Sequence, residues 1–142
     1  MSKFLIQEID LVNANFDDPI FASLRQDYPD FDSWLNKVKH LSNRKMIFSK
    51  DDKGFYRAVA ILKYNSNGSV KLSTFKVNQS SWGHGLGTEL MLQVIEENKG
   101  KQVYIQVKPK YTKLLRFLAH FGFIIVESKS NKNDDLTLAV SL

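Results

Sequence analysis

The sequence predicts one α+β domain, residues 1–142, in which about four helices flank a mixed, mostly antiparallel sheet of six to seven strands. Two observations support this class. A hydrophobic content of 43% over 142 residues is enough for one proper core. Short apolar runs typical of strands are interspersed with runs whose apolar residues recur every three or four positions, as in amphipathic helices. The order of these runs along the chain defines the elements that we expect.

The first half of the chain predicts one strand, two helices and three antiparallel strands. The apolar run 4–9 indicates a strand, and Asp18-Pro19 is a typical helix start. A second helix, capped by Asp30 or Asp32, has apolar residues at helical spacing as far as Leu41. Strands are expected at 45–50, 55–64 and 70–77. The Asn-Gly pair at 67–68 is a strong tight-turn signal, so the last two strands should pair antiparallel.

The second half predicts two helices and three further strands. The helices cover about 86–98 and 111–121, where Gly100 and Gly122 are placed to end them. The strands are expected at 102–107, 123–127 and 136–140. The strands at 70–77 and 102–107 are joined through a helix and should therefore run parallel. The aromatic residues Phe117, Phe121 and Phe123 are expected in the core.

Composition excludes several kinds of site. The chain has no cysteine, which excludes disulfides, thiolate nucleophiles and thiolate metal sites. Its three histidines, His40, His84 and His120, lie far apart without ligand spacing, so no metal is expected. No apolar run approaches the roughly 20 residues of a membrane span, and the N-terminus lacks a signal-peptide pattern. We therefore expect a cytoplasmic protein with no membrane partner.

Positive charge is concentrated in the second half of the chain. Of the net charge of +5, residues 71–142 carry +4. Six basic residues and no acidic one lie between positions 99 and 116: Lys99, Lys101, Lys108, Lys110, Lys113 and Arg116. This segment would suit an anionic ligand or a nucleic acid. A solvated basic face explains it equally well.

Three of the seven glycines, Gly83, Gly85 and Gly87, alternate at the start of the helix expected from residue 86. Glycine costs about 1 kcal/mol relative to alanine in a helix, so the cluster needs a reason. The usual reason is phosphate binding by backbone N–H groups at a helix N-terminus. A P-loop is excluded because no Gly-x-x-x-x-Gly-Lys-Ser/Thr run exists. A dinucleotide fold is excluded because the cluster follows antiparallel strands and the next strand does not end in an acid.

Two segments resemble motifs of the GNAT family of N-acetyltransferases. Residues 77–87, Val-Asn-Gln-Ser-Ser-Trp-Gly-His-Gly-Leu-Gly, resemble its central motif, in which a strand end and a short loop lead to Arg/Gln-x-x-Gly-x-Gly/Ala at a helix start. Residues 114–123, Leu-Leu-Arg-Phe-Leu-Ala-His-Phe-Gly-Phe, resemble its C-terminal helix, which ends in a Gly-Phe pair. The expected order of elements is also that of the family, so the resemblance covers nearly the whole chain.

The resemblance implies an acyltransferase that moves an acetyl group, not an aminoacyl group, from acetyl-CoA to a primary amine by direct attack. In the family the pyrophosphate of CoA lies at the helix start. The pantetheine arm lies between the strands equivalent to 70–77 and 102–107, and the thioester would point toward residues 72–74. By the same resemblance the cofactor-binding residues are Phe75, Val77, Trp82, Gly83, His84, Gly85, Leu86, Gly87, Thr88, Tyr111 and Leu114.

The chain departs from the family pattern where catalysis is concerned. The first motif position is Ser80, with Gln79 adjacent. Many members have a tyrosine four residues before the Gly-Phe pair that protonates the CoA thiolate, but this chain has Leu118. The strand 70–77 also lacks the glutamate that some members use as base. We expect Tyr111 to act as the acid; general burial habits favour a packing residue at this position as the competing interpretation. The other candidates are Tyr64, Tyr104 and His120.

The sequence leaves the acceptor and some alternatives open. The missing tyrosine and glutamate favour, as an alternative, a catalytically degenerate member that keeps CoA binding as a sensor or interaction module. The basic segment raises tRNA as an acceptor, although its lysines would also suit the 3′-phosphate of CoA. The acceptor site is expected within residues 20–41, where Asp27, Asp30 and Asp32 would suit a cationic amine. Monomer and homodimer are both compatible with the sequence.

Overall fold

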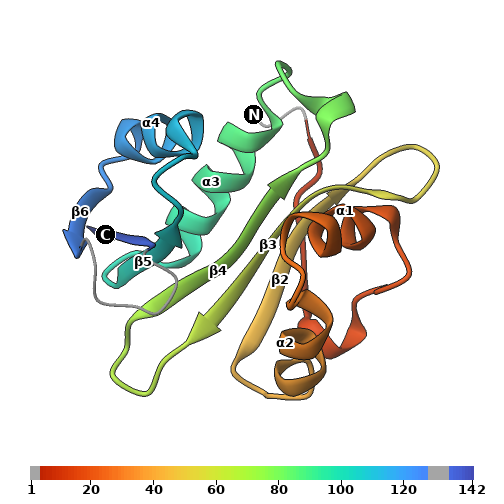
Figure 1. Ribbon diagram of the computed structural model, residues 1–142, viewed down its shortest axis with the longest axis horizontal. Coiled ribbons are helices and arrows are strands. Elements are labelled where there is room, and N and C mark those ends of the chain that lie inside the picture. The colour runs from red at the N-terminus through yellow and green to blue at the C-terminus, as the bar shows by residue number, and fades with distance from the viewer. Residues whose placement is uncertain (1–3, 128–134) are drawn as a thin grey trace.

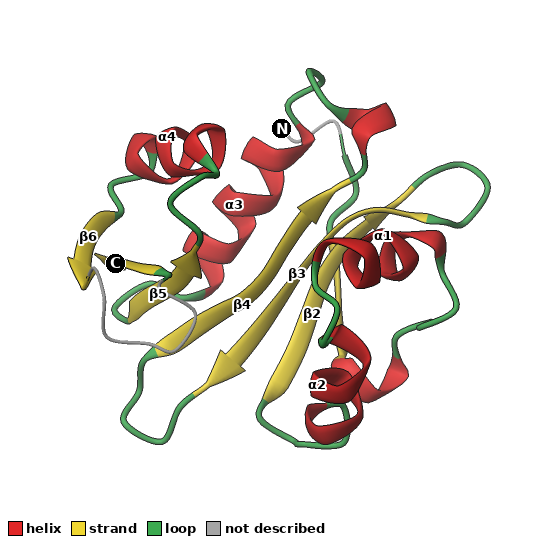
Figure 2. Ribbon diagram, in the orientation of Figure 1, coloured by secondary structure: helices red, strands yellow, loops and turns green. Residues whose placement is uncertain are grey.

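The computed structural model describes residues 4–127 and 135–142, which form one seven-stranded sheet with helices on both faces (Figures 1 and 2). The strand order is β1-β2-β3-β4-β5-β7-β6, and every neighbouring pair is antiparallel except β4 and β5. This confirms the predicted class and the parallel pair. The strands are β1 (Gln7–Asp10), β2 (Arg44–Lys50), β3 (Tyr56–Tyr64), β4 (Val70–Val77), β5 (Gln102–Val107), β6 (Ile124–Glu127) and β7 (Leu136–Ser141). The helices are α1 (Pro19–Asp27), α2 (Phe31–Val38), α3 (Leu86–Glu97) and α4 (Thr112–His120), with short 3-10 turns η1 (Leu11–Asn13) and η2 (Gln79–Ser81).

Two element boundaries differ from the predictions by three residues, whereas the others agree to within one residue. The first strand begins at Gln7, three residues later than expected. The second helix ends at Val38, and Leu41, which we expected on its apolar face, is 47% exposed. After Val38 the chain tightens into a turn in which the Leu41 N–H donates to the Val38 carbonyl at 3.0 Å. The helical spacing of Leu41 was therefore coincidental.

α1 and α2 cover one face of the sheet, over β2 and β3 (Figure 1). Phe21 and Leu35 pack there against Met46 and Ile61. Asp18 fixes the start of α1, as predicted from the Asp-Pro pair. One oxygen of this buried carboxylate accepts from the Ile20 N–H at 2.9 Å, and the other accepts from the Tyr56 N–H of β3 at 2.9 Å. The helix start is thus bonded directly to the sheet.

α3 and α4 contribute to a second core on the opposite face. Leu86, Leu90 and Met91 of α3 are fully buried against residues of β2 to β5. Leu118 is the fully buried residue of α4. The prediction of an aromatic core stripe is only partly right, because Phe123 is buried whereas Phe117 and Phe121 are half-buried. These two rings remain partly open because α4 stands beside the diverging strands described next.

β4 and β5 separate soon after they meet. Their parallel pairing consists of Val70 with Val103 and Lys71 with Tyr104, and the strands then diverge (Figure 1). Near the point of divergence β4 carries a bulge: Leu72 lies opposite Leu62 and Thr74 lies opposite Ile61, so Ser73 is an extra residue. Because β5 moves away, the β5-facing backbone of β4 from Leu72 to Val77 is not used in the sheet that the described residues form.

Candidate active site

A cavity of about 1300 Å³ opens where β4 and β5 diverge. Its walls come from β4, the C-terminal end of β5, the first turns of α3 and α4, and the connection between α1 and α2. One cavity therefore reaches from the glycine-rich start of α3 to the surface of the sheet beneath α1 and α2. The two ends differ in their chemistry.

The start of α3 is built for an anion. Gly83 and Gly85 have φ values of 80° and 84°, a left-handed conformation that L-residues with side chains rarely adopt. A Cβ atom at either position would meet nothing within 4 Å, so glycine is required here by conformation and not by space. Gly85 is the N-cap of α3, and the first-turn N–H groups have no partners within the helix. Together with the helix dipole, these donors favour a phosphate group.

Trp82 stands at the mouth of the cavity just before this helix. Trp82 is 59% exposed, yet its Nε1–H donates to the Val77 carbonyl at 2.8 Å. This bond holds the indole across the end of β4. A fixed, exposed aromatic face at this place offers a stacking surface for a planar ligand group.

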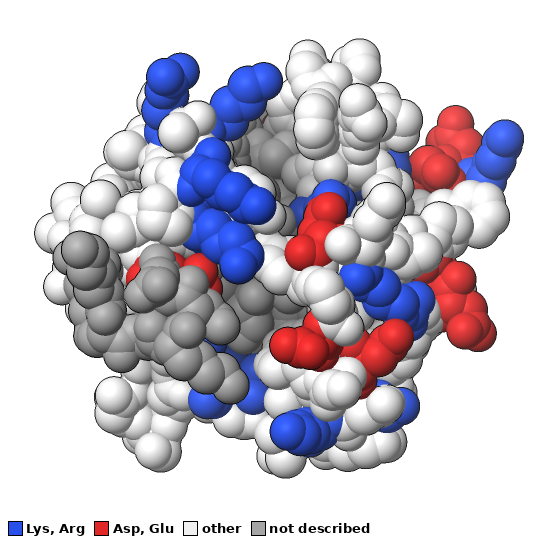
Figure 3. All heavy atoms as spheres, viewed as in Figure 1, with Lys and Arg blue, Asp and Glu red and all other residues white. Residues whose placement is uncertain are grey.

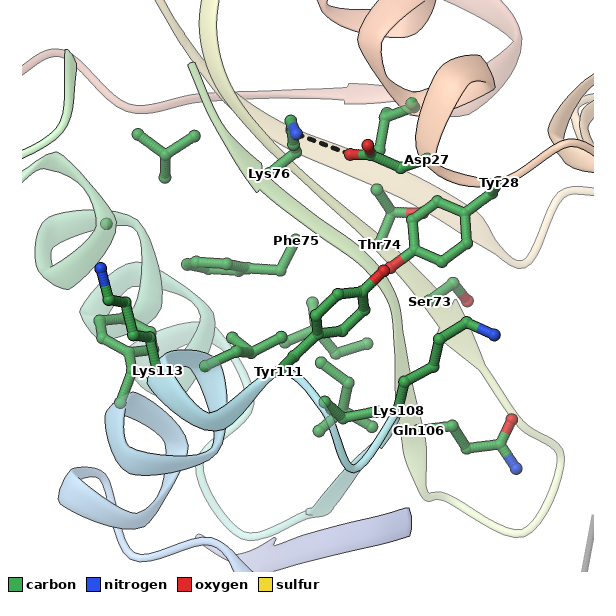
Figure 4. Close-up of a pocket in the computed structure, with 18 of the residues that line it drawn as sticks. Asp27, Tyr28, Ser73, Thr74, Phe75, Lys76, Gln106, Lys108, Tyr111 and Lys113 are labelled. Atoms are coloured by element: carbon green, nitrogen blue, oxygen red, sulfur yellow. Dashed lines mark hydrogen bonds and ion pairs between the residues drawn. The ribbon is translucent and has the colours of Figure 1, made fainter. Parts of the chain in front are cut away.

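Aromatic and apolar side chains form the wall between β4 and α4. Phe75 of β4 and Phe117 of α4 are 5.6 Å apart between ring centroids, and Leu114 lies in the same lining. Three lysines of the basic segment, Lys108, Lys110 and Lys113, line the cavity, and Figure 4 shows Lys113 beside this wall. Lys99, Lys101 and Arg116 do not line the cavity. The wall therefore combines an apolar groove with flanking positive charge.

Two tyrosines face each other across the middle of the cavity. Tyr111 is the N-cap residue of α4, and Tyr28 is the C-cap residue of α1. In Figure 4 their hydroxyl groups point toward each other beside Thr74 of β4. Burial raises the pKa of Tyr28, and the nearby Tyr111 raises it further. Tyr28 therefore stays protonated at neutral pH, where it is a hydrogen-bond donor.

A family model described as the acetyltransferase (GNAT) family matches residues 9–123. The chain belongs to this family. The match includes β2 to β5, α3 and α4, the elements that form most of the cavity wall. The glycine-rich helix start and the diverging parallel strands thus belong to a GNAT acetyltransferase.

Solved structures share the fold at low sequence identity. IAA acetyltransferase from Bacillus cereus superposes with a TM-score of 0.78 at 16% identity, covering 99% of this chain and 100% of that one. An aminoglycoside 6′-N-acetyltransferase in complex with coenzyme A gives 0.73 at 16% identity, covering 96% of each chain. A nourseothricin acetyltransferase gives 0.58 at 15% identity, covering 70% of this chain and 65% of that one. A comparison with curated protein sequences finds no match.

Most of the predicted cofactor-binding residues of this GNAT chain lie together. Ten of the eleven line the cavity; the exception is His84, which is exposed on the loop before α3. Of the four candidate catalytic residues, Tyr111 alone lies in the lining. The Tyr104 hydroxyl accepts from Asn65 Nδ2 at 3.2 Å, at the β3–β4 hairpin. The Tyr64 ring lies 5.2 Å from Lys101 Nζ, and His120 packs edge-on against Phe121.

Two of the three aspartates expected at the acceptor site, Asp27 and Asp30, line the cavity, and so does Asp135. Asp27 pairs with Lys76 of β4 at 2.9 Å, and Asp32 pairs with Arg25 at 2.7 Å. Asp30 lines the cavity and has no ion pair among the described residues. Lys71 and Gln106 also line this end, and no sequence pattern had indicated them. Figure 3 shows Lys and Arg atoms gathered over α4 and the loop before it, opposite Asp and Glu atoms over α1 and α2.

The described residues of the GNAT chain offer no arrangement of metal ligands. Across residues 4–127 and 135–142, no group of three or more His, Asp or Glu side chains could hold a metal ion. None of the helices in this part of the chain is long and apolar enough to cross a membrane.

Proposed function

We propose that this GNAT protein transfers the acetyl group of acetyl-CoA to a primary amine, which attacks the thioester carbonyl directly. The observation that carries the proposal is the single cavity joining the glycine-rich start of α3 to the bulge of β4. One end suits phosphates and the other has room for an acceptor. The fold neighbour named aminoglycoside 6′-N-acetyltransferase, which was solved with coenzyme A, supports this pairing of cofactor and acceptor.

The cofactor would follow the unpaired edge of β4. The pyrophosphate would accept hydrogen bonds from the first N–H groups of α3 and from the Thr88 hydroxyl. The pantetheine arm would lie in the gap between β4 and β5, against the packed rings of Phe75 and Phe117, with its amides on the backbone of Phe75 and Val77. Lys110 and Lys113 are placed at the same wall and would attract the 3′-phosphate.

The chemistry would take place at the bulge. The amine nitrogen bonds to the thioester carbonyl carbon, the C–S bond then breaks, and the sulfur leaves as CoA thiolate. Tyr111 would give its hydroxyl proton to the thiolate, and the nitrogen would lose its extra proton to solvent. Tyr111 would then regain a proton from solvent, so that the protons balance over one turnover. Holding both reactants in one cleft supplies most of the acceleration, since neither a covalent intermediate nor a strong base is required.

Calorimetric titration with acetyl-CoA tests the cofactor site. We expect the wild-type protein to bind and Gly85→Glu to lose binding, because the carboxylate repels phosphate at the helix start. Gly68→Glu is a matched control: Gly68 has a φ of 89° and equally open space, but it lies in the β3–β4 turn. Because both positions have a positive φ, both substitutions should cost a similar backbone strain of about 1–2 kcal/mol. Normal binding by Gly85→Glu, or no binding by the wild type at millimolar ligand, would refute the site.

The degenerate alternative is favoured by Leu118, which is fully buried in place of the usual tyrosine. It predicts that acetyl-CoA binds but that no thiol is released with amines, peptides or tRNA as acceptors. If tRNA is the acceptor, it should shift the protein in a gel, and the shift should weaken steeply as salt rises. Thiol release with any acceptor would reject the degenerate alternative.

A further inference from the structure

Three basic residues form a row across the sheet at the acceptor end of the cavity. Arg44 of β2 lies directly opposite Lys63 of β3, and Lys63 lies directly opposite Lys71 of β4. Residues paired in this way project from the same face of a sheet. The face is that of α1 and α2, because the Arg44 guanidinium lies 5.9 Å from the ring centroid of Trp34 in α2. We call Arg44, Lys63 and Lys71 the basic row.

The basic row is costly for the protein on its own. Arg44 is only 6% exposed, and its Nε has no hydrogen-bond partner. Within the described part of the chain, no carboxylate lies within 4.0 Å of any of the three cations. Like charges on directly opposed residues repel, and a buried charge without a partner is destabilising. Burial and the neighbouring Lys63 and Arg44 lower the pKa of Lys71, while Asp135 acts in the opposite sense.

The basic row meets the cavity at one of its members, Lys71, and at Trp34, which lies against Arg44. Lys108, the residue that follows β5, extends toward the side where Ser73 lies (Figure 4). The sheet side of the acceptor end thus carries positive charge, while Asp27, Asp30 and Asp135 line the cavity as well.

The phosphates of the cofactor cannot account for this charge. The phosphates would lie at the end of β4 that leads to α3, which is Val77. Lys71 lies six residues before Val77, and this separation is about 20 Å along an extended strand. The part of the cofactor closest to Lys71 would be the uncharged thioester. Asp135 also lines the cavity and attracts Lys71, so it offsets part of the charge of the row. The remaining positive charge is available to an anion from another molecule.

We propose that the basic row binds an anionic group, a carboxylate or a phosphate, carried by the acceptor, so that the acceptor class is an amine with a second, negatively charged group. This inference rests on the proposed function, because it identifies the substrate class of the same site. Lys71 contacts the anion, and Lys63 and Arg44 strengthen the positive potential behind it. The amine of the same molecule then lies between the basic row and the bulge of β4.

Matched acceptors test the proposal by thiol release from acetyl-CoA. ω-Amino carboxylates are compared with alkylamines of the same length, and O-phosphoethanolamine with ethanolamine. We expect kcat/KM to favour the charged member of one pair by at least about tenfold, the size of one charge-assisted hydrogen bond. The two pairs distinguish a carboxylate from a phosphate. Equal rates for both members of every pair would overturn the proposal and leave the proposed function intact.

Variants of the basic row then show which residues cause the preference for the charged acceptor. Lys71→Gln should lower it by about tenfold, mainly through KM, and Lys63→Gln should lower it less. Lys45→Gln is the matched control, because Lys45 neighbours Arg44 on β2 but projects from the opposite face, where it pairs with Glu8. Thermal unfolding shows whether each variant is folded. A preference that survives in both Lys71→Gln and Lys63→Gln would place the anion elsewhere.

Titration of the same acceptors separates this inference from the proposed function. If acetyl-CoA binds without turnover, the Kd values of charged and uncharged acceptors for the CoA-bound protein provide the comparison. If acetyl-CoA does not bind, the proposed function fails, and titration of the free protein with the same compounds still tests the basic row. In either case, the proposal is supported if the wild type binds the charged acceptor more tightly and Lys71→Gln does not. The proposal is refuted if the wild type binds the charged and uncharged acceptors equally well.

Discussion

Tyr111 and Tyr28 reach toward each other from opposite walls of the cavity, but we expect them to differ in importance. Tyr111→Phe removes the hydroxyl that would protonate the leaving thiolate, so kcat should fall by about 10²-fold while the KM for acetyl-CoA changes little. Tyr28→Phe removes a hydroxyl that only orients its partner, and should lower kcat by about two- to tenfold. Thiol release at saturating acceptor measures both values.

The tyrosine prediction has a built-in comparison, because both substitutions remove one hydroxyl and keep the ring. Equal losses in the two variants would indicate that the hydroxyls act only as a pair. An unchanged kcat in Tyr111→Phe would show that Tyr111 is a packing residue, which is the alternative interpretation of this side chain.

Single residues differ in how far the sequence could reveal their roles. Gly83 and Gly85 could be predicted, because a left-handed φ is a property that glycine alone adopts readily. Tyr28 could not, since its place in the cavity depends on a segment more than 80 residues away that carries Tyr111. The basic row was hidden for the same reason. Its three members come from three strands, and only the register of the sheet aligns them.

At the scale of elements, Asp18 is the residue that attaches α1 to the sheet. Asp18→Ala removes the cap of α1 and leaves the buried Tyr56 N–H without its acceptor. We expect a loss of about 2–4 kcal/mol in the free energy of unfolding, measured by urea denaturation. Asp17→Ala is the control, because Asp17 is exposed and should change stability by less than about 0.5 kcal/mol. Similar losses in both variants would contradict the capping role.

Elements with local signals were predicted well, and those without them were not. The Asp-Pro start of α1 and the Asn-Gly turn between β3 and β4 both involve neighbouring residues, and both are found. The end of α2 has neither glycine nor proline to mark it, so the apolar spacing alone extended the helix to Leu41. The bulge at Ser73 likewise has no local signal, because it arises from the pairing of β4 with β3.

At the scale of the whole molecule, the decisive feature is a sheet that opens in its middle. The helix that joins them predicted that β4 and β5 run parallel, and they do. Apolar alternation could not predict that they pair at only two positions, because a strand shows the same alternation whether or not its edge is bonded. The divergence places the cavity between the two cores, with α3 and α4 on one side and α1 and α2 on the other.

Because the cavity separates these two layers, a ligand that fills it should stabilise the entire fold. Acetyl-CoA at 100 times its Kd should add about 2.7 kcal/mol and raise Tm by about 5–10 °C. Differential scanning calorimetry measures the shift, and we expect it in Gly68→Glu but not in Gly85→Glu. At the same concentration, dephospho-CoA should give a smaller shift if Lys110 and Lys113 hold the 3′-phosphate. Equal shifts for the two ligands would assign those lysines to another role, and an undiminished shift in Gly85→Glu would place the cofactor away from α3.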